Sequence, residues 1–294
     1  MSATLSPRIR LWGISPAQFP SETSTPEELK EFLAPLLTDA LSFISDVPAD
    51  PETLGSTNWK PKGLKSFEHS VAPVYLFQRD VAVSDLRQLA ESNSSVNAGK
   101  NQIAPETWFL RRSLHKDAAT KGTATWEEFV RCFKNEHAES ELAFTASILN
   151  TKLHRQWDCS SVEIEHDGNM WVDWTLKYEA STHKLPAPLK KRYFPVLQAT
   201  ASIRDKREFV TIQICVDGPA ESDKTGEATP SDATKAVYTS IERVVEQEKG
   251  IEWIMGTVSD ARGGLPSWLQ KLSVPGAVAK DVGMFMEWIP SQRK

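Results

Sequence analysis

The C-terminal segment of the chain constrains the fold most strongly. A strand pattern over Ile251–Val258 is followed by Gly263 and Gly264, which supply the backbone freedom that a sharp reversal needs. Pro266 suits the first turn of a helix, where its missing N–H group is not used. The helix expected over 266–289 carries large apolar residues around most of its circumference: Trp268, Leu269, Leu272, Val278, Val282, Phe285, Met286 and Ile289. Such a helix must pack on an apolar surface, so we expect it to lie over the core or over an internal cavity.

Composition narrows the class of protein. The chain has 294 residues, 40 % apolar and 25 % charged, and these values are ordinary for a soluble globular protein. The net charge of −5 gives no electrostatic reason for binding nucleic acid. Three cysteines without Cys-x-x-Cys spacing indicate reduced thiols rather than a disulfide framework. No apolar run approaches the ~20 residues of a membrane span, and the first residues lack the apolar core of a secretory signal. We therefore expect a cytoplasmic protein, with peripheral attachment to membranes left open.

Helices and strands are expected in an α+β order. Capping boxes at Thr25–Glu28 and Thr125–Glu128 mark two helix starts. The expected helices span residues 25–45, 84–92, 125–133, 137–153 and 266–289. The expected strands span residues 74–77, 106–114, 162–166, 170–179, 197–203, 208–216, 237–245 and 251–258, with a hairpin turn at Asp167-Gly168. Strands that follow one another by hairpins favour an antiparallel sheet over the alternating order of a parallel one.

The domain organisation follows from these elements. Residues 1–72 are expected to form an N-terminal extension with one helix packed on the domain, and residues 46–72 a surface connection. Residues 73–294 are expected to form the domain itself. The segment 219–236 contains no Leu, Ile, Val or aromatic residue, so it has nothing to bury and is expected to be a disordered loop.

Several motifs after Trp108 resemble a known superfamily. They are Trp108-Phe-Leu-Arg-Arg-Ser-Leu-His115, Trp126-Glu-Glu-Phe129, His137-Ala-Glu-Ser-Glu141, Asp167-Gly168 with Trp171, Leu185-Pro-Ala-Pro-Leu189 with Arg192-Tyr-Phe-Pro195, and Ser259 to Leu269. The chain resembles START-like (helix-grip, Bet v 1-like) proteins, and within them the fungal domain-of-unknown-function family 3074. This resemblance implies a curved antiparallel sheet wrapped around the C-terminal helix, with a cavity for a hydrophobic ligand between them. It implies no catalytic residue.

A set of residues is expected to line that cavity. It combines one apolar face of each hairpin with the inner side of the last helix: Arg112, Val172, Trp174, Leu176, Tyr178, Val210, Ile212, Ile214, Trp253, Met255, Leu269, Leu272, Val282, Phe285 and Met286. Arg112 shares a strand face with Trp108 and Leu110, so its charge either reaches the rim, pairs with a carboxylate or meets a ligand. If the face assignment is reversed, Arg111 takes that role. Tyr178 either orients a ligand oxygen or bonds to the backbone within a filled core.

The sequence leaves three functions open. The first is non-covalent binding, and transfer, of a hydrophobic small molecule such as a lipid, sterol or polyketide-like compound. The second is an enzyme of the same fold, similar to polyketide cyclases, with Arg112, Tyr178 and Glu242 as suspects. The third is an interaction scaffold with a filled core. Convergence of titratable groups with perturbed pKa values inside the cavity would favour the enzyme.

The sequence favours a hydrophobic partner over a metal or a cofactor. His137 and Glu141 are four residues apart and could share a metal, but no second histidine lies nearby, so an ordinary contact on a helix face is favoured. No cofactor, metal site or catalytic residue is expected, and no nucleic acid. The expected partner is a hydrophobic small molecule or lipid. The cations around Leu185–Leu189 allow transient membrane contact, although a solvated turn is favoured.

Overall fold

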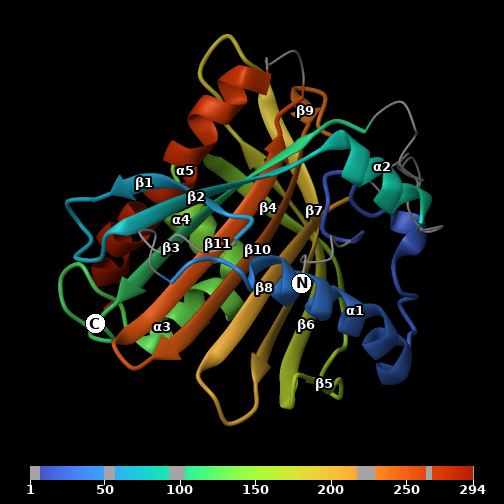
Figure 1. Ribbon diagram of the computed structural model, residues 1–294, viewed down its shortest axis with the longest axis horizontal. Helices are drawn as coiled ribbons and strands as arrows, with labels where there is room; N and C mark the ends of the chain where they lie inside the picture. Colours follow the sequence, from blue (N-terminus) through green and yellow to red (C-terminus); the bar gives the residue numbers. More distant parts are fainter. Residues whose placement is uncertain (1–6, 50–56, 93–102, 217–228, 263–266, 294) are drawn as a thin grey trace.

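One large curved sheet organises the molecule (Figure 1). The computed structural model describes residues 7–49, 57–92, 103–216, 229–262 and 267–293, without the side chains of 267–273. The strands are β1 (Lys60–Lys65), β2 (Val74–Val81), β3 (Glu106–His115), β4 (Ile148–Trp157), β5 (Ile164–His166), β6 (Asn169–His183), β7 (Lys191–Ile203), β8 (Glu208–Cys215), β9 (Ala233–Lys235), β10 (Val237–Gln247) and β11 (Gly250–Asp260). They follow the order β1-β2-β3-β11-β10-β8-β7-β6-β4, with β5 paired to β6 and β9 to β7. Only the β7–β9 pairing among the described strands is parallel.

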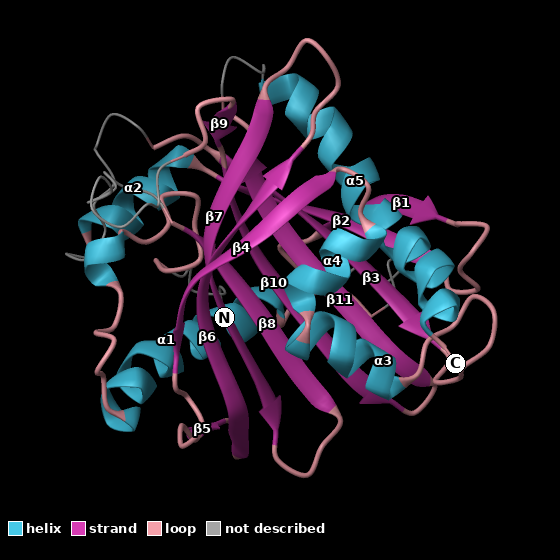
Figure 2. Cartoon of the chain, turned by 180° about the vertical axis from the view of Figure 1, so that it is seen from behind, coloured by secondary structure: helices cyan, strands magenta, loops and turns pink. Residues whose placement is uncertain are grey.

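Helices cover both faces of this sheet. They are α1 (Pro26–Ile44), α2 (Val83–Glu91), α3 (Trp126–Val130), α4 (His137–Phe144) and α5 (Ser267–Trp288), with short helical turns at Pro16–Gln18, Arg131–Asn135 and Ile289–Gln292. Helix α1 crosses the near face in Figure 1, while α3, α4 and α5 lie across the opposite face, which is nearest in Figure 2. We call these the α1 face and the α5 face. None of the helices in the described parts has the length and apolar character needed to cross a membrane.

Strand alternation divides the core into two layers. On the α1 face, side chains such as Leu110, Ile212 and Ile254 pack with Leu33 and Phe43 of α1. On the α5 face, a second cluster joins residues of β2, β8, β10 and β11 to the helices: Val74, Leu76, Phe129, Phe133, Phe209, Val244, Trp253, Val282, Phe285 and Met286. The three cysteines, Cys132, Cys159 and Cys215, are free and buried. The sheet therefore has an apolar layer on each side.

The expected α+β class and the antiparallel sheet with a C-terminal helix are confirmed. Both capping boxes form, since the Thr25 and Thr125 side chains accept hydrogen bonds from the backbone N–H groups of Glu28 and Glu128. The hairpin turn at Asp167-Gly168 also forms, with positive φ at both residues. The expected turn at Gly263-Gly264 lies outside the described residues.

The helix expected over residues 137–153 is wrong in its second half. Helix α4 ends at Phe144, and Ile148–Trp157 is the edge strand β4. Leu149 and Leu153 are four residues apart, which imitates a helical stripe, but both side chains are exposed on this edge strand.

Three other segments also differ from expectation. Residues 60–65 form β1 rather than a connection, and all six positions are exposed, so no apolar pattern marks the strand. Helix α2 begins after Ala82 without a side-chain cap, rather than at Ser84. Within the expected disordered segment, residues 219–228 lie outside the described residues, but 233–235 form β9 through backbone pairing with β7. Backbone pairing needs no apolar side chains, which is why composition missed β1 and β9.

Candidate functional site

The candidate site lies where α4 crosses the central strands on the α5 face. Tyr238, Ser240 and Glu242 alternate on β10 toward this face, while Ile241 joins the core of the α1 face. Partner residues in neighbouring strands have the same polar character: Arg111, Ser113, Glu179, Gln198, Thr200, Thr211 and Gln213 are all buried. The centre of the α5 face is thus polar, and the apolar helix cluster adjoins it.

Glu242 organises the charges at this centre. Its Oε1 accepts hydrogen bonds from Arg111 Nη2 at 3.2 Å and from Trp253 Nε1 at 2.6 Å. Its Oε2 lies 3.5 Å from His137 Nε2, and His137 Nδ1 lies 3.8 Å from Glu141 Oε2. The Arg111 guanidinium also lies 3.7 Å from the centre of the Trp253 ring, a cation–π contact. Two cations and two carboxylates therefore form one connected cluster.

The protonation states follow from this arrangement. Burial alone would lower the pKa of His137, but Glu141 and Glu242 outweigh it and raise that pKa to about 9. Burial alone would raise the pKa of Glu242, but His137 and Arg111 hold it below its usual range. Burial raises the pKa of Asp281, on α5 near Arg111, to about 7. His137 is therefore an imidazolium at neutral pH, paired with an ionised Glu242.

A small cavity opens beside this cluster, between α4 and the sheet. It is lined by His137, Ala138, Glu141, Thr151, Glu179, Ala180, Ser181, Val196, Gln213 and Tyr238. The space open to the centre of a water molecule is about 10 Å³, which is room for about one water-sized group. Burial raises the pKa values of Glu141, Glu179 and Tyr238, the titratable lining groups besides His137. Two larger hollows are open surface features at Asp205–Glu208 and Gln156–Ser160.

Aromatic rings continue from the cavity toward the beginning of β7. Phe194 lies 5.4 Å from Tyr238 and 5.0 Å from His183, measured between ring centres. All three side chains are half-buried. The polar cavity therefore borders an accessible aromatic strip on the same face.

Next to the cavity, the helix cluster is filled. The Phe133 ring lies 4.4 Å from that of Trp253 and 4.7 Å from that of Phe285, and Trp253 and Phe285 are 5.7 Å apart. Rings at these distances leave no free space between them. The apolar part of the α5 face is thus a packed core in this state.

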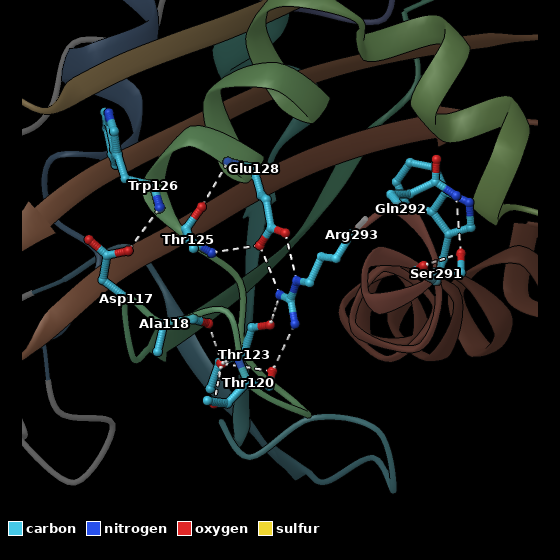
Figure 3. A network of polar contacts seen from close by, with 11 residues as sticks. Asp117, Ala118, Thr120, Thr123, Thr125, Trp126, Glu128, Ser291, Gln292 and Arg293 are labelled. Carbon is cyan, nitrogen blue, oxygen red and sulfur yellow. Dashed lines mark hydrogen bonds and ion pairs between the residues drawn. The ribbon is translucent and has the colours of Figure 1, made fainter.

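The C-terminal end of α5 is fastened by Arg293 (Figure 3). Arg293 Nε and Nη2 donate to the two carboxylate oxygens of Glu128 at 2.7 and 2.8 Å, and Nη1 and Nη2 donate to the carbonyl oxygens of Thr120 and Thr123. Within α5, the backbone at Gly283 lies close to Phe67. A Cβ added at position 283 would stand 2.9 Å from the Phe67 ring. Both contacts fix the helix against the sheet.

The residues expected to line one cavity divide between the two faces. Trp174, Leu176, Tyr178, Val210, Ile212 and Ile214 are buried in the core of the α1 face. Trp253, Val282, Phe285 and Met286 lie together in the cluster of the α5 face, with Met255 half-buried in the same strand. The side chains of Leu269 and Leu272 lie outside those described. The structure therefore does not bring the full set together, and a ligand-binding role stays a prediction for each group.

Arg112 and Val172 have separate environments. Arg112 Nε donates to Glu252 at 2.8 Å and Nη1 donates to the carbonyl oxygen of Pro48 at 2.6 Å, so this arginine is ion-paired near the rim of the α1 face. Val172 is half-buried at a β-bulge, where the register with β7 shifts before Thr175. The bulge breaks the alternation that placed Val172 with Trp174.

Sequence reasoning missed Glu179 and Asp281 as members of the site, and it included Arg111 only for the case that the face assignment of its strand is reversed. It noted His137 with Glu141 and suspected Glu242, and the structure brings these three together. A carboxylate among β-branched residues of a central strand was the available signal, and Glu242, between Ile241 and Arg243, carries it. In the part of the chain that is described, no three His, Cys, Asp or Glu side chains are arranged to hold a metal ion.

Comparison with known proteins places this geometry in context. The sequence model of a protein family described as "Protein of unknown function (DUF3074)" matches residues 108–289. Human STARD10 is similar in structure, with a TM-score of 0.53 and 12 % identity over 85 % of this chain and 78 % of that one. Human StAR-related lipid transfer protein 5 gives a TM-score of 0.55 and 9 % identity over 90 % of this chain and 99 % of that one. A search of curated proteins finds no match. The START-like fold is thereby confirmed.

Proposed function

Since this chain belongs to the DUF3074 family of proteins of unknown function and has a START-like fold, we propose that it binds a hydrophobic small molecule between the α5 face and helices α4 and α5. Lipids, sterols and polyketide-like compounds are the candidate classes. One of the structurally similar proteins is by name a lipid transfer protein, which supports this class of ligand. Transfer of the ligand between membranes is the further part of the proposal.

The cavity beneath α4 is the observation that carries this proposal. It combines polar lining groups with a direct border on the half-buried rings of Tyr238 and Phe194. A ligand with one polar end and an apolar body matches that division, because its polar end finds hydrogen-bonding groups and its body covers apolar rings. Since the cavity has room for only about one water-sized group, binding of the body requires the helices to move apart from the sheet.

Membrane contact of a carrier would involve the loop between β6 and β7. Lys184, Leu189 and Lys190 are exposed there. Arg192, by contrast, is buried and donates to the carbonyl oxygens of Lys190 and Ala261 at 2.5 Å, so it is not available to lipid headgroups. We propose transient contact of a cytoplasmic protein with anionic membranes through the exposed residues of this loop, with a contribution of about 1 kcal/mol per cation.

Native mass spectrometry of the purified protein, followed by solvent extraction, tests the binding function. A hydrophobic molecule retained at one per chain supports it. A mass equal to that of the chain alone, together with no uptake of sterol, phospholipid or fatty acid, contradicts it and favours a scaffold with a filled core.

Acid–base catalysis on an apolar substrate is the second candidate. Its supporting observation is the convergence of Glu141, Glu179 and His137 on one cavity, with the pKa of each raised. Arg112 and Tyr178, suspected for this role, lie on the α1 face. Incubation of extracted ligand with the protein distinguishes the two functions, because catalysis changes the ligand and binding returns it unaltered.

A further inference from the structure

The charges around the cavity do not balance among the side chains that contact one another. Arg111 and His137 are the two cations of the cluster, and Glu242 and Glu141 are the two carboxylates paired with them. Glu179 on β6 adds a third carboxylate that also lines the cavity. The cavity therefore has one more potential negative charge than its contacts neutralise.

Glu179 is buried without a partner. Only 7 % of the residue is exposed. Among the described residues its carboxylate has no hydrogen bond and no ion pair, and its oxygens are not fully enclosed, because the residue lines the cavity. Lys177 lies two residues away on the same strand and is half-buried, but it forms no ion pair with Glu179. A buried carboxylate without a partner is costly, so such a group either takes up a proton or awaits a cation. Burial accordingly raises the pKa of Glu179, with His137 and Lys177 acting in the opposite direction.

Three other polar groups that line the cavity have partners of their own. Ser181 Oγ lies 2.9 Å from His183 Nε2, and Gln213 donates to Gln198 and accepts from Ser240. Tyr238 is hydrogen-bonded to Gln213. Among the lining groups, Glu179 is thus the carboxylate without a hydrogen bond or an ion pair, at a cavity with room for about one water-sized group. His137 Nδ1 also has no hydrogen bond, and its nearest carboxylate is Glu141 Oε2 at 3.8 Å.

From this geometry we propose that the cavity binds the primary ammonium end of an amphipathic amine, with Glu179 as its main partner. A primary ammonium group is of the size of a water molecule, carries three donors and supplies the missing positive charge. Glu141 borders the same space and accepts a second of these hydrogen bonds. The apolar chain of the amine then lies along Tyr238 and Phe194. This inference rests on the proposed binding function and adds the chemistry of the polar end.

Anionic and neutral ends fit this cavity less well. A carboxylate or phosphate group would face Glu179 and Glu141 at close range, and like charges at such distances repel. The cation that lines the cavity, His137, already contacts Glu242 and Glu141. Arg111 does not line the cavity, because its guanidinium is bonded to Glu242 and lies over Trp253. A hydroxyl group could donate to Glu179, but it would bring no positive charge.

Isothermal titration calorimetry at pH 7.5 with decylamine, 1-decanol and decanoate tests the inference. The three probes share one chain length and differ in the end group, and decylamine is protonated at this pH. We expect decylamine to bind about 10-fold or more tightly than decanol, because a charge-assisted hydrogen bond in a buried site is worth at least that factor. We expect decanoate to bind most weakly.

Variants connect this preference to Glu179. Glu179→Gln should weaken decylamine binding about 10-fold and leave decanol binding unchanged, and Glu141→Gln should reduce decylamine binding by a smaller factor. Glu163→Gln, at an exposed ion pair with Arg204, is the matched control and should change none of the affinities. Circular dichroism spectra of each variant establish that it is folded.

The outcomes separate this inference from the proposed function. Equal binding of all three probes, or tightest binding of decanoate, overturns the ammonium site and leaves hydrophobic binding in place. Binding of none of the probes, with no ligand found by native mass spectrometry, overturns the function itself. A preference for decylamine that survives in folded Glu179→Gln also overturns the assignment to Glu179.

Discussion

Glu242 shows how one carboxylate can hold several buried groups in place. It is 4 % exposed and contacts Arg111, Trp253 and His137 from three different elements. Each of these donors would be left without an acceptor if Glu242 were removed, and unpaired buried charges cost several kcal/mol. The arrangement of the α5 face therefore depends on the ionised state of this one residue and on the protonated state of His137.

The protonation of His137 gives a prediction for stability against pH. Its folded pKa of about 9 lies above the unfolded value near 6.5, so the stabilisation is full below about pH 6.5 and is lost as pH rises through 9. A pKa raised from 6.5 to about 9 corresponds to about 3 kcal/mol. We expect the free energy of unfolding in urea to fall by about this amount between pH 6.5 and 9.5 in the wild-type protein, and to change much less in His137→Gln.

Several groups face His137 and bear on that measurement: Glu141 from its own helix, Glu242 from β10, Glu179 from β6, Arg111 from β3 and Asp281 from α5. Asp281, with a pKa of about 7, is mostly ionised by about pH 8. It therefore contributes little to the change in stability between pH 8 and 9.5. NMR of the ring nitrogens provides the control, because burial lowers the pKa of His115 to about 3 and that ring should stay neutral. Parallel stability curves for the wild type and His137→Gln would contradict the prediction.

At the residue scale, the sequence indicated which charged residues belong to the site but not the face of the sheet on which each one lies. The strand containing Arg111 and Arg112 has large apolar residues at both parities, Trp108 and Leu110 on one side and Phe109 on the other. Both faces of this strand are buried, so hydrophobic alternation cannot distinguish them. The choice of Arg112 followed from counting apolar neighbours, whereas the helices decide which face holds the cavity.

At the scale of elements, α5 is positioned by two small details rather than by its apolar stripe alone. Gly283 lets the helix backbone approach the Phe67 ring, and Arg293 bonds the following turn to Glu128 at the start of α3. Gly276 of the same helix faces open space, while Gly283 serves close packing. The helix is therefore held most tightly over its C-terminal half.

Alanine substitutions at the two glycines of α5 test this difference. A Cβ at position 283 would meet Cγ and Cβ of Phe67 at 2.9 and 3.1 Å, so Gly283→Ala should lower stability by about 1–3 kcal/mol. Gly276→Ala adds a side chain in open space and should be neutral or stabilising by up to about 1 kcal/mol. Thermal unfolding of both variants measures the contrast, and equal effects at the two positions would show that Phe67 does not limit the approach of α5.

Elements with strong local signals were predictable, and those formed by pairing were not. The capping boxes at Thr25 and Thr125 fixed two helix starts because the signal lies within four residues. Strand β4 was taken for helix because Leu149 and Leu153 have helical spacing and lie exposed on an edge. For β1 and β9, the partner strand rather than the local sequence determines the conformation.

At the scale of the whole molecule, the sheet separates two cores with different roles. The core of the α1 face is largely apolar and includes most of α1, whose Leu29, Leu33, Leu36 and Leu37 are almost fully buried. It also contains three buried charged residues beside Phe43 and Trp108: Arg10, Arg79 and Glu106. The α5 face combines an aromatic cluster with the buried charges and the cavity. Stability is thus expected to come largely from the side that α1 covers, and binding from the other.

A substitution in α1 tests whether that helix supports the whole fold. Leu33 is 0 % exposed, so Leu33→Ala should cost about 2–5 kcal/mol. Leu64, on edge strand β1, is 52 % exposed, and Leu64→Ala should cost less than about 1 kcal/mol. Urea unfolding followed by both tryptophan fluorescence and far-UV circular dichroism should give one coincident transition in each variant. A Leu33→Ala protein that loses α1 alone, with the sheet transition unchanged, would show that the N-terminal region is an independent unit.

The burial of all three thiols makes the native protein suitable for site-specific labelling. Each cysteine is at most 3 % exposed, and burial raises the pKa of Cys132, and that of Cys159 to about 11. Maleimides react with accessible thiolates, so the natural cysteines should stay unmodified while the protein is folded. Lys280 is exposed, so Lys280→Cys would then carry a fluorophore on α5 without removal of any native cysteine. Movement of this helix during ligand uptake could in this way be followed in real time.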